Sequence, residues 1–133
     1  MKKTLLLAVA LACSGTVAQE KQIWACQMVE GTMIKWESDR WINYLVIPYG
    51  ILFTLRPDNI AIAKRGDSDT SLYLNCSHNS TFNRYSCLNS TLGDHYLLSP
   101  DDGKLGYSQL TGAISTAVSR DSINAETFNC TKF

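Results

Sequence analysis

Short apolar or alternating runs, separated by turn residues, recur along the chain from residue 22 onward. Residues 22–28 alternate, with Trp24, Cys26 and Met28 on one face, and residues 71–76 place Leu72 and Leu74 on one side. Period-two alternation is typical of β-strands with one buried face. The pattern predicts roughly eight to ten strands, drawn from segments 22–28, 32–36, 41–47, 51–55, 59–64, 71–76, 84–89, 96–99, 104–110, 113–118 and 126–132.

Turn residues stand between these runs, and they favour antiparallel connections. Residues 37–40 are polar, residues 56–59 contain Pro57 before Asp58 and Asn59, and residues 100–103 read Pro-Asp-Asp-Gly, the clearest turn signal in the chain. Proline pre-sets φ, whereas Asp, Asn and Gly tolerate tight backbone geometry. We therefore expect an all-β fold, an antiparallel meander closed as a small barrel or stacked as a sandwich.

One segment also fits a helix. Between Met33 and Leu45, the apolar positions Met33, Trp36, Trp41, Tyr44 and Leu45 share a helical face. We expect β structure because β-branched and aromatic residues are dense there, and no alanine or cap supports a helix.

The first 18 residues have the layout of a bacterial secretory signal peptide. Lys2 and Lys3 precede an apolar stretch from Leu5 to Ala12, which is too short to span a bilayer as a helix. Cleavage after Ala18 predicts a secreted or periplasmic protein with a single domain, residues 19–133. Alternatively, Ala10-Leu11-Ala12-Cys13 is similar to a lipoprotein box. Cys13 would then carry a lipid and anchor the protein to a membrane.

Cys13 is either lost with the signal peptide or lipidated, so four cysteines are left for disulfides under either cleavage: Cys26, Cys76, Cys87 and Cys130. An even number in an exported chain predicts two disulfides, although four cysteines allow three pairings. We expect Cys76 to pair with Cys87 across one hairpin, and Cys26 to pair with Cys130, joining the first strand to the last. No metal or cofactor is expected, since zinc sites use closely spaced cysteine pairs that are missing here.

Charge and candidate chemistry point away from nucleic acids and from catalysis. The chain has 12 basic and 12 acidic residues, and the basic residues are scattered. Only His78 and His95 could act as a histidine base, and no G-x-S-x-G motif occurs. Asp94 precedes His95, but neighbours on a strand point to opposite faces. We therefore predict no catalytic residues, while a small hydrolase using His95 and Asp94 stays an alternative.

Aromatic residues are the best candidates for a binding surface. Trp24 and Trp36 lie within alternating runs and are expected in the core, whereas Trp41 lies beside a polar turn. The predicted surface comprises Trp41, Tyr44, His95 and Tyr96. A protein or saccharide at the cell envelope is the expected partner.

Several short features together resemble small exported bacterial β-proteins of unassigned function. They are Trp24-x-Cys26, the tryptophans that flank residues 37–40, Asp101-Asp102-Gly103, and Phe128-x-Cys130. The resemblance implies the scaffold and no site.

The resulting hypothesis is a non-enzymatic exported binding module. One version is an inhibitor of an attacking hydrolase, since Gly93-x-x-Tyr96 is similar to the S-G-x-x-Y loop of bacterial lysozyme inhibitors, without the preceding serine. A secreted hydrolase and a barrel that carries a small ligand are the alternatives.

Overall fold

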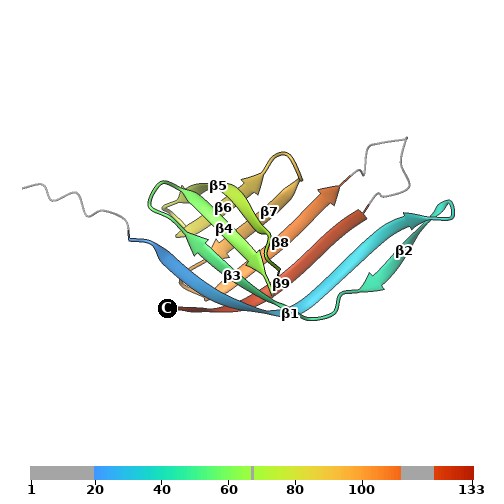
Figure 1. Ribbon diagram of the computed structural model, residues 1–133, viewed down its shortest axis with the longest axis horizontal. Helices are drawn as coiled ribbons and strands as arrows, with labels where there is room; N and C mark the ends of the chain where they lie inside the picture. Colours follow the sequence, from blue (N-terminus) through green and yellow to red (C-terminus); the bar gives the residue numbers. More distant parts are fainter. Residues whose placement is uncertain (1–19, 67, 112–121) are drawn as a thin grey trace, which may run out of the picture.

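The computed structural model describes residues 20–66, 68–111 and 122–133, which form β-strands and no helix (Figure 1). The expected all-β class is confirmed, and the expected strand at 113–118 lies outside the described residues. The strands are β1 (Gln22–Glu37), β2 (Arg40–Leu45), β3 (Gly50–Leu55), β4 (Ile60–Arg65), β5 (Ser71–Asn79), β6 (Arg84–Asn89), β7 (Asp94–Ser99), β8 (Lys104–Thr111) and β9 (Ser122–Lys132).

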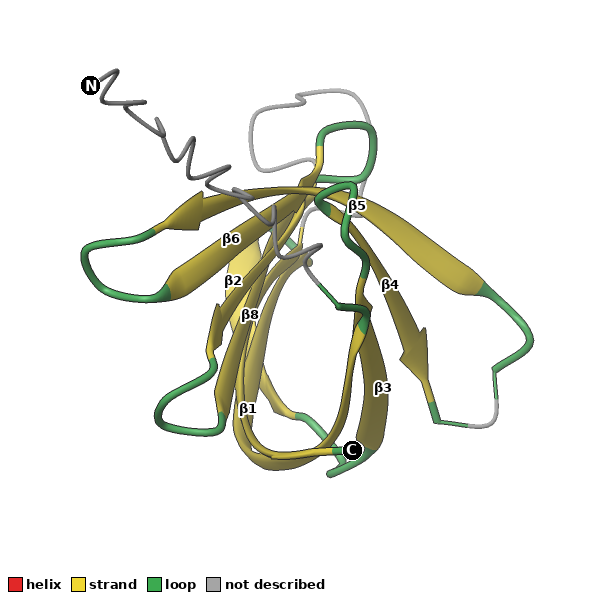
Figure 2. Ribbon diagram, turned by 90° about the vertical axis from the view of Figure 1, so that its left-hand side faces the viewer, coloured by secondary structure: helices red, strands yellow, loops and turns green. Residues whose placement is uncertain are grey.

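Eight of these strands close into an antiparallel barrel. The hydrogen-bonded order is β2-β1-β3-β4-β5-β6-β7-β8-β9, and a further pairing joins β1 to β9. Strands β1 and β3 to β9 therefore form a closed ring, visible end-on in Figure 2. Of the two predicted architectures, the barrel is correct. Strand β2 pairs with β1 outside the ring and extends away from it in Figure 1.

Strand β1 is a single long strand where the sequence pattern predicted two. Its register against β9 shifts between Met28 and Glu30, which marks a β-bulge. Gly31 follows, and a Cβ there would lie 3.0 Å from Cγ of Glu126 and 3.2 Å from Sδ of Met28. Gly31 thus lets β1 pass close to the neighbouring β9.

The helical alternative for Met33 to Leu45 is wrong. Met33 lies opposite Tyr44 and Trp36 opposite Trp41 in the β1–β2 hairpin. Its turn residues Ser38 and Asp39 both have positive φ, which matches the two-residue hairpin turn whose twist suits paired strands.

Strands β5 to β8 form a meander with a short, regular repeat. The turn before each of β6, β7 and β8 ends in a left-handed residue, at Asn83 (φ 46°), Gly93 (φ 71°) and Gly103 (φ 59°). In the first two turns, the side chains of Asn79 and Asn89 accept hydrogen bonds from backbone N–H groups two and three residues later. Strand β5 extends to Asn79, beyond the end of the predicted segment 71–76, so the connection to β6 is shorter than expected.

Alternate residues of every barrel strand point inward and fill the interior. Phe53 and Leu98 are fully buried. The buried apolar set is Trp24, Cys26, Met28, Ile51, Phe53, Leu55, Ala61, Ala63, Leu74, Tyr85, Cys87, Tyr96, Leu98, Leu105, Tyr107 and Phe128.

Both expected disulfides are present. Cys26–Cys130 crosses the β1–β9 junction, and Cys76–Cys87 links the neighbouring strands β5 and β6. The first therefore cross-links the seam at which the ring closes.

The two disulfides should differ in their effect on stability. Their cysteines are separated by 104 and 11 residues. Loop entropy then assigns about 4 to 5 kcal/mol to Cys26–Cys130 and about 3 kcal/mol to Cys76–Cys87. Denaturant unfolding of the paired alanine variants should show the larger loss for Cys26→Ala with Cys130→Ala. Equal losses would contradict the assignment.

Two glycines of the β7–β8–β9 wall should respond differently to alanine. Gly103 has positive φ, and a Cβ there would lie 2.8 Å from the carbonyl oxygen of Cys130, whereas a Cβ at Gly106 meets nothing within 4 Å. We expect Gly103→Ala to lower the free energy of unfolding by about 1 to 3 kcal/mol. Gly106→Ala should leave it unchanged or raise it by about 0.5 to 1 kcal/mol. Thermal unfolding of both variants measures the contrast.

Candidate functional site

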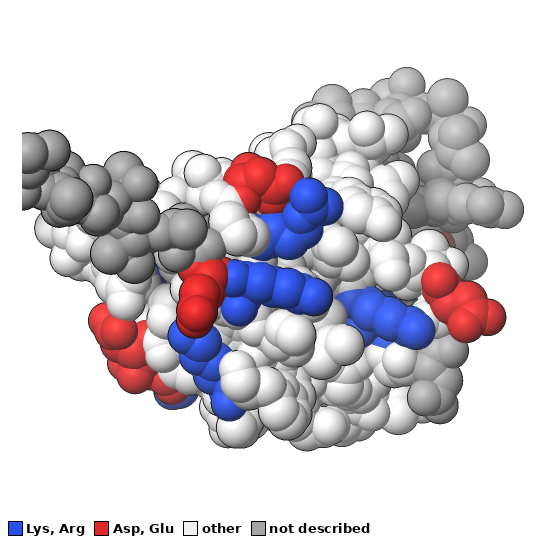
Figure 3. Space-filling model, turned by 60° about the vertical axis from the view of Figure 1, so that its left-hand side comes forward, with Lys and Arg blue, Asp and Glu red and all other residues white. Residues whose placement is uncertain are grey.

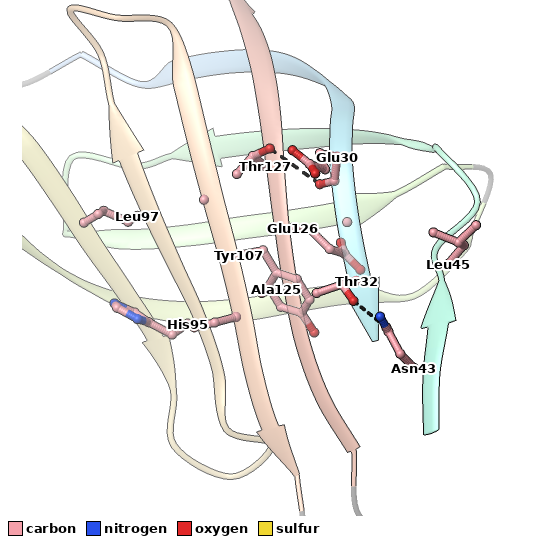
Figure 4. Close-up of a pocket in the computed structure, with 13 residues that line it drawn as sticks. Glu30, Thr32, Asn43, Leu45, His95, Leu97, Tyr107, Ala125, Glu126 and Thr127 are labelled. Atoms are coloured by element: carbon pink, nitrogen blue, oxygen red, sulfur yellow. Dashed lines mark hydrogen bonds between the residues drawn. The ribbon is translucent and has the colours of Figure 1, made fainter. Parts of the chain in front are cut away.

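A surface concavity lies on the outer side of the barrel wall. A groove of about 650 Å³ extends across β7, β8, β9 and β1 as far as β2 (Figure 4). Asp94, Tyr96, Tyr107 and Glu126 are buried in the interior, so the residues that alternate with them face outward into this groove.

Small residues form its floor and larger ones its two sides. The floor includes Gly106, Ser108, Ala125 and Thr127. His95 and Leu97 on β7 stand at one side, and Asn43 and Leu45 on β2 at the other, as Figure 4 shows. The groove therefore depends on the small side chains of two cross-strand pairs, Gly106–Thr127 and Ser108–Ala125, and on the position of β2.

The β2 side of the groove is held by the extension of β1 beyond its bulge. Thr32 donates a hydrogen bond from Oγ1 to Oδ1 of Asn43 at 2.7 Å. Leu45 is 92% exposed, so its side chain is available to a partner. Glu30 also lines the groove and supplies an exposed negative charge.

His95 is hydrogen-bonded but is not part of a catalytic triad in the described structure. Its Nε2 lies 2.8 Å from Oγ of Ser86 on the neighbouring strand. Asp94 is 4% exposed and points inward, so it cannot reach the outward-facing His95. The pair proposed for the hydrolase alternative is therefore not assembled.

The four predicted surface residues do not form one surface. His95 lines the groove. Trp41 is 45% exposed and packs edge-to-face on Trp36, with ring centroids 5.3 Å apart. Tyr44 lies on the other face of the hairpin and donates a hydrogen bond to Glu37. Tyr96 is 6% exposed inside the barrel, so the Gly93-x-x-Tyr96 segment offers no exposed tyrosine.

The groove was not predicted from the sequence because its floor consists of small residues that form no motif. Gly106, Ala125 and Thr127 become neighbours only through the registers of β8 with β9 and of β9 with β1. The sequence does show small residues at the outward positions of β8 and β9. Recognising that they form one groove requires the registers that pair these strands.

The interior is polar at the end where β7 begins. Tyr107 donates a hydrogen bond to Oδ1 of Asp94 at 2.7 Å, and Tyr49 donates one to Oε2 of Glu126. The Arg65 guanidinium lies 3.5 Å from the centroid of the Tyr49 ring, a cation–π contact. Each buried carboxylate therefore has a phenol donor.

Burial also shifts the ionisation of this cluster. It raises the pKa of Tyr49, Tyr96 and Tyr107, and the carboxylate acceptors raise the pKa of Tyr49 and Tyr107 further, so the phenols stay protonated and can donate. Burial raises the pKa of Asp94, while the hydrogen bond from Tyr107 lowers it in part.

Other site classes find little support in the described residues. They contain no group of three or more His, Cys, Asp or Glu residues that could hold a metal ion. No helix in that part of the chain is long and apolar enough to cross a membrane. Basic and acidic side chains lie beside one another on the face shown in Figure 3.

Comparisons with known proteins found no match to any protein-family model, curated protein or solved structure.

The buried Asp94 should make stability depend on pH. Because its pKa is raised on folding, its favourable contribution is complete below the ordinary value of 3.8 and is lost as pH rises through the folded pKa. As pH rises through this range, we expect the free energy of unfolding of the unmodified protein to fall relative to that of Asp94→Asn. Urea unfolding at several pH values tests this, with exposed Asp69→Asn as the control. A difference independent of pH would contradict it.

Proposed function

We propose that this chain is an exported, non-enzymatic binding module that holds an extended segment of a partner protein in its outer groove. The observation that carries the proposal is the groove of about 650 Å³, whose small-residue floor lies between two sides that each present a leucine, Leu97 and Leu45. This volume falls in the range of about 300 to 1,000 Å³ that is usual for ligand sites.

The side chains of the groove favour a protein segment over a saccharide. Leu45 and Leu97 offer apolar contacts at opposite sides, and Glu30 suits a basic side chain. Sugar platforms use exposed aromatic faces. The ring of Tyr107 is buried, and no other aromatic residue lines the described groove. We therefore expect a segment with apolar side chains and a lysine or arginine near Glu30.

Two alternatives fit less well. A hydrolase would need a base, an orienting carboxylate and oxyanion donors around Ser86 and His95. Strands β6 and β7 are paired on both sides, so their backbone N–H groups are committed to the sheet. A ligand-carrying barrel would need an open apolar interior, whereas the described interior is occupied by packed side chains such as Phe53 and Leu98.

The two disulfides suggest an oxidising environment outside the cytoplasm. We infer secretion or a periplasmic location directed by residues 1–18, with anchoring through a lipid on Cys13 as the alternative. These residues lie outside the described part of the chain. In such a compartment the partner could be an attacking hydrolase, as the inhibitor version of the hypothesis holds.

Peptide display against the purified, disulfide-intact protein tests the proposal. Selected peptides should contain apolar residues with a basic residue, and Gly106→Leu should weaken their binding at least tenfold because the new side chain fills the floor. Asn75→Leu is the matched control, since it adds the same side chain to an exposed position on β5. Titration calorimetry measures both affinities.

The position of the bound peptide provides an independent check. Chemical-shift changes should centre on His95, Ala125 and Thr127 rather than on β4 and β5. Peptides that bind Gly106→Leu as tightly as the unmodified protein would refute the groove as the binding site.

A further inference from the structure

Strand β2 is an edge strand that carries exposed apolar side chains and has one edge without a pairing strand in the described part of the chain. In the described part of the chain it pairs with β1 alone. Leu45 is almost fully exposed, and Trp41 and Tyr44 are also exposed. Edge strands normally carry charges, prolines or bulges that prevent pairing with another chain. Within β2 only Arg40, at its first position, is charged.

The hairpin geometry shows which backbone groups face away from β1. The two-residue turn closes at the Glu37–Arg40 pair, and hydrogen-bonded pairs alternate along an antiparallel ladder from there. Arg40, Ile42 and Tyr44 therefore direct their N–H and C=O groups toward β1. Trp41, Asn43 and Leu45 direct theirs toward the free edge.

These outward groups are self-complementary about Asn43. A two-fold axis perpendicular to the sheet leaves the same face of both copies on the same side of the joined sheet. Because side chains alternate between the two faces, a residue with an odd number must then lie opposite another residue with an odd number. Centring the axis on Asn43 places Asn43 opposite its copy and Trp41 opposite Leu45 of the second copy. All three outward positions then form hydrogen-bonded pairs, with two backbone bonds at each pair.

The side chains agree with this register on both faces. In this register Trp41 would pack on Leu45 of the second copy on the groove face, and Ile42 would pack on Tyr44 of the second copy on the other face. Such cross-strand apolar and aromatic pairs stabilise sheets. Arg40 lies beyond the end of the paired segment, so no like charges oppose one another.

We propose that β2 is a homodimer interface, in which two copies of this chain join edge to edge through antiparallel β2 strands centred on Asn43. The two outer walls would become one continuous sheet. This proposal is independent of what occupies the groove.

Sedimentation equilibrium of the purified protein over a concentration series tests it. We expect a change from the mass of one chain to twice that mass. Asn43→Lys and Asn43→Glu should each stay monomeric, because the register sets like charges directly opposite, and an equimolar mixture of the two should form the heterodimer. Thr32→Val is the matched control: it removes the Thr32–Asn43 hydrogen bond without adding charge, and it should still dimerise.

Hydrogen exchange on the unmodified protein tests the same register without a variant. Protection of the amides of Trp41, Asn43 and Leu45 should rise with concentration, whereas that of Ile42 and Tyr44 should not. A single-chain mass at every concentration would overturn the proposal. So would a dimer that persists in Asn43→Lys, or a mixture of the two charged variants that stays monomeric.

Discussion

The pairing of β1 with β9 is the constraint on which the rest of the molecule depends. It closes the ring between the first and last strands, and Cys26–Cys130 cross-links it covalently. Without this pairing the sheet would have two open edges, and its inner face would have no opposite wall to pack against. The same pairing continues past the bulge at Met28 and Glu30, which carries β1 out of the ring to hold β2.

The inner and outer faces of the barrel differ in what they can do. Its interior is apolar along most of its length and becomes polar at the end with Asp94 and Glu126, where phenols satisfy both carboxylates. Its outer wall is hollowed where β8 and β9 carry small residues. Because the interior is filled, this scaffold is suited to presenting an outer surface rather than to enclosing a ligand.

The β1–β2 hairpin contributes to both proposals. It forms one side of the groove through Asn43 and Leu45, and its outer edge offers the unpaired backbone groups of the same strand. Binding in the groove would use the Leu45 side chain, and pairing at the edge would use the free backbone groups of β2 together with the same Leu45 side chain. A partner segment in the groove would lie close to the dimer junction, so the two events could be measured for coupling.

The sequence by itself determined the β class, most strand positions, the turns and the opposite directions of Asp94 and His95, and it favoured the two disulfide pairings that the structure then showed. These depend on local alternation, on turn chemistry and on cysteines at matching positions of paired strands. Only the tertiary structure decided that residues 22–37 form one strand, that the sheet closes as a barrel, that Tyr96 faces inward and that Gly106 and Ala125 lie in one groove. Alternation divides residues between two faces but does not say which face is enclosed, because that depends on pairing between strands distant in the chain.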